Sequence, residues 1–390
     1  MNLEYVIEKD VNPLKMLQEY GQSVWLDFIQ RSLLTSNELE RLIKEDGLRG
    51  VTSNPAIFEK AITGSNDYTG ILNKLAPKYE DPKAIYEQVA IRDIQDAADV
   101  MRPVYEETNY RDGYVSMEVS PLLARDTKGT MEEARHLWRA IGRDNIMIKV
   151  PGTKEGIPAI EQLTSEGMNI NVTLLFAKDT YEKVAKTYIS GLEKYVAKGG
   201  DPSKVASVAS FFISRIDSAI DAQLNDRLKK SENSNEQALL KSLLGNIAIA
   251  NAKLTYQLYH NIFSGPNWLA LADKGAPTQR ILWASTSTKN PSYRDVIYVE
   301  ELIGSDTDNT IPPATLVAFR EHGQLRPSLT EALEDAHKTM ENLKGLGISM
   351  KNITDKLLDD GVNLFADAFE KLLNAVDKTS QTIRSAKINE

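Results

Sequence analysis

Eight short apolar runs, each followed by an amphipathic stretch, limit most strongly what this chain can fold into. The runs, in order, are VWLDFI, GVTSNPAIF, YVSMEVS, NIMIKVP, MNINVTLLF, VASVASFFIS, RILWASTS and NTIP. Apolar strands that alternate with helices are typical of a parallel sheet buried on both faces. Eight such units favour a closed (β/α)8 TIM barrel over an open doubly wound sheet. No glycine fingerprint for a dinucleotide follows the first run, which also counts against the open sheet.

Two helical stretches fall outside these eight units. One runs from about Asn233 to Phe263. The other belongs to C-terminal helices at about 329–378, and its apolar residues recur every three or four positions: Leu358, Val362, Phe365, Phe369, Leu372 and Val376. This spacing predicts a helix that packs on the barrel, and such a stripe is more often core packing than a functional surface. Since no linker or repeat interrupts the chain, we predict one domain over 1–390, with its barrel core at about 22–325.

Two capping boxes predict where helices begin. In each, a threonine precedes a glutamate by three residues: Thr35 with Glu38, and Thr130 with Glu133. In this motif each side chain accepts a hydrogen bond from a backbone N–H that the helix leaves unpaired. We therefore expect helices to begin at these two threonines.

The composition excludes several classes of function. The formal net charge is −9 and basic residues do not cluster, which argues against a nucleic-acid partner. No apolar run approaches the roughly 18 residues of a membrane span. The N-terminal segment MNLEYVIEKDVNPLK lacks the basic and apolar regions of a secretory signal. Cysteine is absent, so disulfides and thiolate chemistry are excluded. We expect a cytoplasmic protein.

Metal chemistry has little support in the sequence. The chain has four histidines, which lie far apart: His136, His260, His322 and His337. A three-histidine zinc site would have to be assembled from distant positions. We therefore predict no metal and no cofactor.

Polar side chains stand near the ends of the predicted strands, where the active sites of barrels are built. They are Asp27, Asn54, Glu118, Lys149, Asn171, Thr173, Ser210, Arg215, Ser285 and Lys289. Most of them have an ordinary explanation as turn, cap or strand residues. Lys149 and Glu118 are harder to explain, because burying either charge without a partner costs several kcal/mol.

Two explanations of Lys149 stay open from the residues alone. Lys149 and Glu118 could form a structural ion pair. Alternatively, a lysine in a dry site loses its proton more easily and becomes an amine nucleophile that forms a Schiff base with a ketone. Asp27 and Glu118 could then transfer protons, and Arg215 with Lys289 could hold a phosphate. The second explanation describes a sugar-phosphate aldolase of the Schiff-base type.

The motifs GVTSNPAIF, VSMEVSP, IMIKVPGT, NINVTLLF and SFFISRID, in this order, resemble the transaldolases. The resemblance runs from about Val24 to Pro313, and the length is similar to that of a longer bacterial subgroup. It implies a barrel of the class I aldolase superfamily in the pentose phosphate pathway. The implied reaction moves a dihydroxyacetone unit from sedoheptulose 7-phosphate to glyceraldehyde 3-phosphate, giving erythrose 4-phosphate and fructose 6-phosphate. The implied partners are therefore sugar phosphates, while the oligomeric state does not follow.

The resemblance also implies catalytic roles. Lys149 matches the lysine that forms the Schiff base. Asp27 matches the acid/base that deprotonates the C4 hydroxyl of the donor. Glu118 and Thr173 match the pair that holds the water used in forming and hydrolysing the imine.

Substrate-binding roles follow in the same way. Asn54 and Asn171 match groups that bind the dihydroxyacetone hydroxyls. Ser210 and Arg215 match residues on the phosphate side, and Phe212 stands where transaldolases have an aromatic side chain.

The seventh run departs from the family pattern. Many transaldolases have ASFRN there, whereas this chain has ASTSTKN, so that Ser285 aligns but Lys289 replaces an arginine. A lysine would hold the phosphate as a point charge rather than as a bidentate fork. Two alternatives remain: a fructose 6-phosphate aldolase, for which a glutamine and a tyrosine are expected in place of Glu118 and Phe212, and a non-catalytic barrel that binds sugar phosphates.

Overall fold

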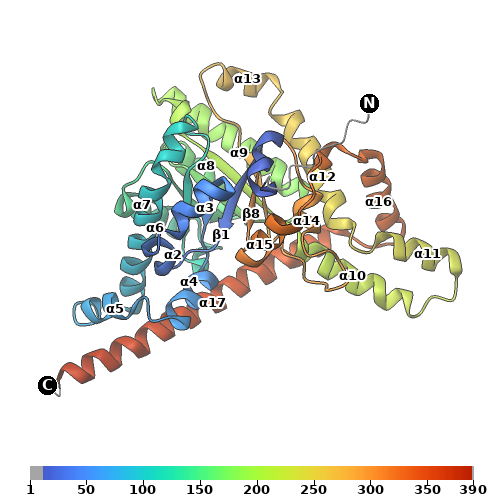
Figure 1. The fold of residues 1–390 in the computed structure, drawn as a ribbon. Coiled ribbons are helices and arrows are strands. Elements are labelled where there is room, and N and C mark those ends of the chain that lie inside the picture. Colours follow the sequence, from blue (N-terminus) through green and yellow to red (C-terminus); the bar gives the residue numbers. More distant parts are fainter. Residues whose placement is uncertain (1–11, 389–390) are drawn as a thin grey trace, which may run out of the picture.

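The fold is a closed barrel of eight parallel strands (Figure 1). The computed structural model describes residues 12–388, so the predicted absence of a secretory signal falls largely outside the described residues. Neighbouring strands follow one another in sequence, and β8 pairs with β1. Each apolar run overlaps one strand: β1 Gln22–Asp27, β2 Leu48–Thr52, β3 Tyr114–Glu118, β4 Ile146–Pro151, β5 Ile170–Leu175, β6 Ser207–Phe212, β7 Arg280–Ala284 and β8 Thr307–Ile311. The predicted (β/α)8 TIM barrel is confirmed.

The register of the strands brings polar residues to one end of the barrel. Glu118 of β3 pairs with Lys149 of β4, and Lys149 pairs with Asn171 of β5. Asp27, the last residue of β1, pairs with Thr52, the last residue of β2. Because parallel strands end at the same face, these side chains meet at the carboxyl end of the barrel.

Helices surround the barrel. Those that follow the strands in turn are α2 Arg31–Thr35, α3 Glu38–Asp46, α4 Pro55–Gly64, α5 Thr69–Leu75, α6 Pro82–Glu107, α7 Thr127–Ile141, α8 Gly156–Thr164, α9 Lys178–Ala197, α10 Ser214–Leu228, α14 Ile297–Glu300 and α15 Pro313–His322. Shorter elements are α1 Pro13–Met16, η1 Leu17–Tyr20, η2 Pro121–Leu123, η3 Pro202–Lys204 and η4 Ser328–Thr330. Within residues 12–388, no helix has both the length and the apolarity to cross a membrane.

Both predicted capping boxes are wrong. Thr35 is the last residue of α2, and α3 begins after Asn37. Helix α7 begins one turn earlier than predicted, because the side chain of Asp126 accepts a hydrogen bond from the N–H of Gly129. Thr130 instead donates to the backbone oxygen of Leu123 at 2.9 Å, so a tertiary contact uses the predicted cap.

The stretch predicted as helical from Asn233 to Phe263 consists of two helices, α11 Ser234–Leu243 and α12 Ile247–Ile262. Gly245 separates them with φ of +71°, a left-handed conformation that glycine adopts without strain. Helix α12 packs against α9, α10 and α16 (Leu333–Gly345), while α13 (Pro266–Ala272) leads back to β7.

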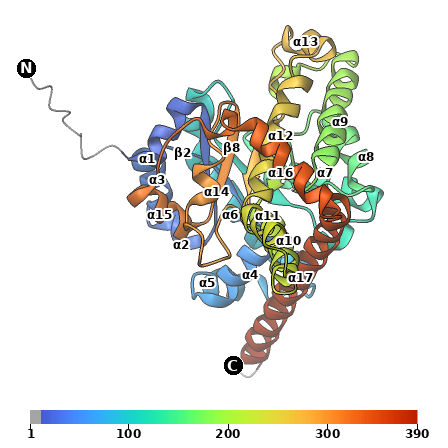
Figure 2. The ribbon, with the colours of Figure 1, turned by 90° about the vertical axis from the view of Figure 1, so that its right-hand side faces the viewer.

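The C-terminal helix α17 (Met350–Ile388) lies on the barrel, as predicted. It contacts α4, α5, α6, α10 and the end of β5, and both views show it running past α4 and α5 to the C-terminus (Figures 1 and 2). Most of its predicted stripe is buried, including Phe369 and Val376, but Leu358 is only half-buried. This helix therefore covers part of the face on which the strands end.

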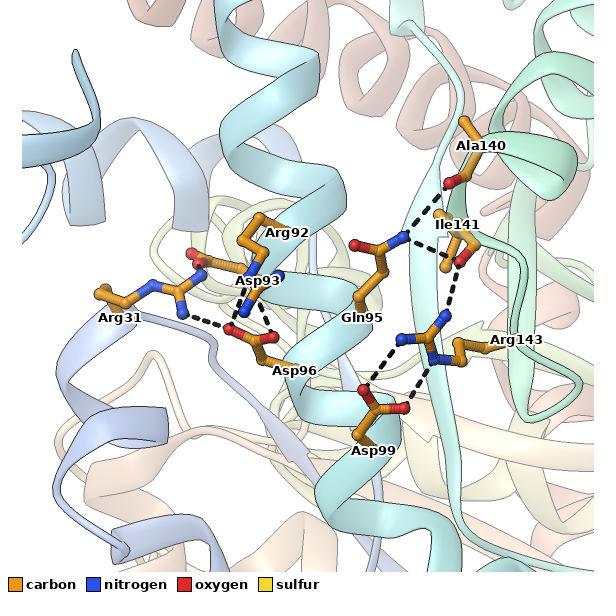
Figure 3. A network of polar contacts seen from close by, with 9 residues as sticks. All are labelled: Arg31, Arg92, Asp93, Gln95, Asp96, Asp99, Ala140, Ile141 and Arg143. Carbon is orange, nitrogen blue, oxygen red and sulfur yellow. Dashed lines mark hydrogen bonds and ion pairs between the residues drawn. The ribbon is translucent and has the colours of Figure 1, made fainter. Parts of the chain in front are cut away.

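A network of charges on α6 anchors the segment that follows β1 (Figure 3). Arg31, in the first turn of α2, forms ion pairs with Asp93 and with Asp96. Asp93 is fully buried and also accepts a hydrogen bond of 2.8 Å from the hydroxyl of Tyr68. Burial raises the pKa of Asp93 to about 6, against the opposing effect of Arg31. Because Asp27 is only four residues before Arg31, this anchor also restrains the end of β1.

The other side of α6 is joined to the end of α7. Arg143 contacts both carboxylate oxygens of Asp99 at 2.6 and 3.0 Å, and Gln95 donates to the backbone oxygen of Ile141 at 3.0 Å (Figure 3). Helix α6 is thus held to α2 on one side and to α7 on the other.

Candidate active site

A cavity of about 420 Å³ opens at the carboxyl end of the barrel. Eight of the predicted site residues line it: Asp27, Asn54, Lys149, Thr173, Ser210, Arg215, Ser285 and Lys289. The other two, Glu118 and Asn171, are buried behind its wall. The structure therefore brings residues of five strands and of the adjoining helices and loops to one place.

Lys149 reaches the cavity from β4 with a side chain that is only 6% exposed. Its Nζ lies 3.1 Å from Oε2 of Glu118, and it donates a hydrogen bond of 2.9 Å to the backbone oxygen of Ser53. The predicted ion pair is therefore present. It does not account for the position of the amine on the wall of a cavity, where a ligand can reach it.

Two carboxyl groups lie in the field of Lys149. Burial raises the pKa of Asp27 and that of Glu118, while the positive charge of Lys149 opposes both shifts. The hydroxyl of Thr52 donates to Asp27 at 2.9 Å. A buried carboxyl group with a raised pKa beside a lysine is a candidate general acid or base.

Asn171 and Thr173 are two residues apart on β5 but have different surroundings. Thr173 is fully buried, and its hydroxyl has no hydrogen-bond partner among residues 12–388. The next residue, Leu174, has φ of +59°, and the pairing with β6 is irregular there, a distortion that redirects side chains near active sites. Asn171 accepts a hydrogen bond of 2.7 Å from Ser210 and donates one of 3.1 Å to Ser116.

Asn54 caps helix α4. Its Oδ1 accepts a hydrogen bond of 3.0 Å from the N–H of Ile57. The cap uses the side-chain oxygen, so the amide nitrogen is the group that is left to donate to a ligand.

Besides Lys149, three cationic side chains line the same cavity: Arg215 at the start of α10, Lys289 after β7, and Lys60 on α4. Among residues 12–388, none of the three has a carboxylate within ion-pair distance. Burial lowers the pKa of Lys289, and the charges of Arg215 and Lys60 lower it further, while the charge of Asp27 opposes these shifts. Lys289 donates a hydrogen bond of 2.6 Å to Ser287. Like charges that converge without a counterion are suited to binding an anion.

Metal ligands are not gathered at this site. In the part of the chain that the structure describes, no group of three or more histidine, aspartate or glutamate side chains could hold a metal ion.

A sequence model of the transaldolase/fructose-6-phosphate aldolase family matches residues 24–376 of this chain. The chain belongs to this family. The resemblance drawn from the motifs is thereby confirmed.

Curated relatives named transaldolase are similar to the chain over nearly its whole length. The transaldolase of Trichodesmium erythraeum (strain IMS101) is 46% identical over 369 residues, which is 94% of this chain and 97% of that protein. Transaldolase 2 of Nostoc punctiforme is 47% identical with the same coverage. The transaldolase of Neisseria gonorrhoeae is 44% identical over 360 residues, which is 92% of this chain and 98% of that protein.

Lys60 and Phe365 are two of the residues lining this transaldolase-family cavity that the sequence reasoning missed. Lys60 had a local signal: a helix capped by Asn54 places Ile57 and Lys60 on one face, and both line the cavity. Phe365 was predicted only as part of the buried stripe of α17. Its periodicity shows that it is buried, but not that the surface it covers is the cavity.

Proposed function

We propose that this protein is a transaldolase acting through a Schiff base on Lys149. In the pentose phosphate pathway it would move a dihydroxyacetone unit from sedoheptulose 7-phosphate to glyceraldehyde 3-phosphate, giving erythrose 4-phosphate and fructose 6-phosphate. The single observation that carries this proposal is the Lys149 amine on the cavity wall, 3.1 Å from the buried carboxyl of Glu118. Because sugar phosphates are charged and remain where they are made, we place the activity in the cytoplasm.

Imine formation is assigned to Lys149, Glu118 and Thr173. Glu118 accepts a proton from the ammonium group, and the free amine attacks the ketone carbon of the donor. The carbinolamine then loses water and becomes the protonated imine. The unpartnered hydroxyl of Thr173 supports its role as a donor to that water. The same groups return the water when the imine is hydrolysed.

Carbon–carbon cleavage is assigned to Asp27. Its carboxylate accepts the proton of the C4 hydroxyl while the C3–C4 bond breaks, and the bonding electrons move into the imine to give an enamine. The aldehyde product leaves. The acceptor aldehyde then takes the reverse path, forming a new C3–C4 bond and recovering the proton from Asp27.

The remaining predicted residues are assigned to binding. The amide nitrogen of Asn54 is the donor available to the dihydroxyacetone hydroxyls, and Ser285 lies beside the cations that would hold the phosphate. Asn171 lies behind Ser210, so its predicted contact with the donor requires their hydrogen bond to open.

We call the three cations Arg215, Lys289 and Lys60 the clamp. Removing one of them should weaken binding of the substrate phosphate and leave binding of an unphosphorylated substrate almost unchanged. For Lys289→Ala and Lys60→Ala we expect the KM for glyceraldehyde 3-phosphate to rise about tenfold, since a hydrogen bond to a charged group contributes ~1.5–3 kcal/mol. The KM for unphosphorylated glyceraldehyde should stay within about twofold. Steady-state kinetics with both acceptors measure this, with the exposed Lys338→Ala as control. Equal losses with both acceptors would contradict the clamp.

The need for an acceptor distinguishes transaldolase from fructose 6-phosphate aldolase, an activity that the family name also includes. We expect fructose 6-phosphate to be turned over rapidly only when erythrose 4-phosphate is added, with little free dihydroxyacetone released in its absence. The cavity position of Phe212 and the identity of Glu118 support this expectation. Stoichiometric release of dihydroxyacetone without an acceptor, at an undiminished rate, would favour the aldolase instead.

A further inference from the structure

The segment after β7 carries Lys289 and continues into α14. Besides the hydrogen bonds between Ser214 and Ser285, two tyrosine–aspartate hydrogen bonds join this segment to α10. The hydroxyl of Tyr293 donates to Oδ2 of Asp221 at 2.8 Å, and the hydroxyl of Tyr298 donates to Oδ2 of Asp217 at 2.8 Å. Both carboxylates belong to α10, whose first turn also carries Arg215. Arg215 and Lys289, two of the three cations of the clamp, are thus connected through these four side chains.

The second oxygen of each carboxylate holds the two helices inserted between β6 and β7. Oδ1 of Asp221 accepts a hydrogen bond of 3.1 Å from the N–H of Gly245, in the break between α11 and α12. Oδ1 of Asp217 accepts one of 2.8 Å from the N–H of Ala248, in the first turn of α12. Each aspartate therefore joins α10, the inserted helices and the segment after β7.

Only glycine fits at position 245 in this arrangement. A Cβ atom at this position would lie 2.8 Å from the ring of Tyr293, which is closer than side chains tolerate. Its φ of +71° also disfavours any other residue. The break between the inserted helices thus both hydrogen-bonds Asp221 and leaves room for the tyrosine that binds Asp221.

The loop is not held to α10 by close packing in this region. A hollow of about 250 Å³ separates them, lined by Asp217, Asp221, Lys289, Asn290 and Tyr293 among others. Where packing is incomplete, directional hydrogen bonds decide where a segment lies. The tyrosine hydroxyls therefore help to set the distance between the loop and α10, together with the hydrogen bonds between Ser214 and Ser285 where the two segments begin.

The aspartates are poor candidates for anchors that serve stability alone. Asp217 is 1% exposed and Asp221 is 6% exposed, and within residues 12–388 neither has a cation at ion-pair distance. Burying carboxyl groups with only neutral donors costs stability, and burial raises the pKa of both groups, that of Asp217 to about 7. Burial of these two carboxyl groups therefore lowers the stability of the fold, while their hydrogen bonds define the position of the segment after β7.

We propose that Asp221 and Tyr293, supported by the break at Gly245, are positioning residues that hold Lys289 at the correct spacing from Arg215. The inserted helices α11 and α12 serve as the buttress of this arrangement. The substrate feature they recognise through Lys289 is a phosphate monoester on the aldehyde acceptor. This inference rests on the proposed function, in which Arg215 and Lys289 bind that phosphate.

Tyr293→Phe removes one hydroxyl and keeps the ring. We expect the KM for glyceraldehyde 3-phosphate to rise three- to tenfold, with kcat and the KM for glyceraldehyde within about twofold of the parent protein. Tyr114→Phe is the matched control, because its hydroxyl donates to the backbone oxygen of Tyr110 at 2.6 Å, outside this loop, α10 and the inserted helices. A lower Tm of Tyr293→Phe with an unchanged ratio of the two KM values would overturn the proposal, since that is what a purely structural bond predicts.

Two further variants keep the test decisive. Gly245→Ala displaces the ring of Tyr293 without removing a hydrogen-bonding side chain, so the same KM change is expected from an independent cause; an unchanged ratio in the folded variant would overturn the proposal. Lys289→Ala is the reference. If Lys289→Ala leaves the ratio of the KM for glyceraldehyde 3-phosphate to the KM for glyceraldehyde unaltered, both the clamp and its positioning residues are contradicted. The Schiff base on Lys149 is tested separately, by borohydride trapping.

Discussion

Lys149→Ala is expected to abolish turnover while the protein stays folded. Without the amine no imine forms, and among residues 12–388 no other lysine lies beside both carboxyl groups. Loss of a covalent nucleophile lowers kcat by more than about 10⁴-fold. The variant leaves Glu118 without its partner. A buried charge left unpaired costs about 3–5 kcal/mol, less if the carboxyl takes up a proton, as the raised pKa of Glu118 favours.

Borohydride trapping is the measurement for this first prediction. In the parent protein, incubation with fructose 6-phosphate and reduction should attach a dihydroxyacetone fragment to the peptide that contains Lys149. No adduct should form on Lys149→Ala. The exposed neighbour Lys154 provides the matched control, since Lys154→Ala should trap normally. An adduct on another lysine, or full activity of Lys149→Ala, would mean that Lys149 is only the structural partner of Glu118.

Asp27→Asn is expected to lower kcat by about 10²- to 10⁴-fold, the usual contribution of a general acid–base group. The amide keeps the size of the carboxyl group and an oxygen that accepts the hydrogen bond from Thr52. Imine formation does not use Asp27, so it should continue. The step that should fail is cleavage of the C3–C4 bond.

The trapped species distinguishes this effect from a general loss of function. Reduction of Asp27→Asn with fructose 6-phosphate should attach the whole six-carbon sugar phosphate to Lys149, whereas the parent protein should give the three-carbon fragment. Mass spectrometry of the peptide separates the two. Cleavage to the fragment at the parental rate in Asp27→Asn would remove Asp27 from its assigned role.

The barrel could be predicted because its strands are buried on both faces. Such strands must be apolar almost throughout, so each of the eight appears as a run that turn and helix signals interrupt. The same pattern drew attention to Lys149 and Glu118, because they are charged residues inside apolar runs. Their pairing follows from the parallel register, in which Glu118 lies opposite Lys149.

Helix starts were less predictable, because a capping residue can have a better partner elsewhere in the fold. Thr130 donates to the backbone oxygen of Leu123, and Glu133 accepts from the N–H of Ser120 at 2.7 Å. A pattern of four residues contains no information about those contacts. The cap that operates is Asp126, one turn earlier.

The sequence alone was enough to predict the eight strands, the fold class and the residues that stand at the strand ends, because burial and periodicity are local properties of the chain. The tertiary structure decided which side chains reach the cavity and which lie behind it, as for Asn171. It also decided that Lys60 and Phe365 belong to the cavity, and that the inserted helices meet the loop of Lys289. These outcomes depend on how separate elements pack, and packing distances between elements far apart in the chain leave no periodic signal in it.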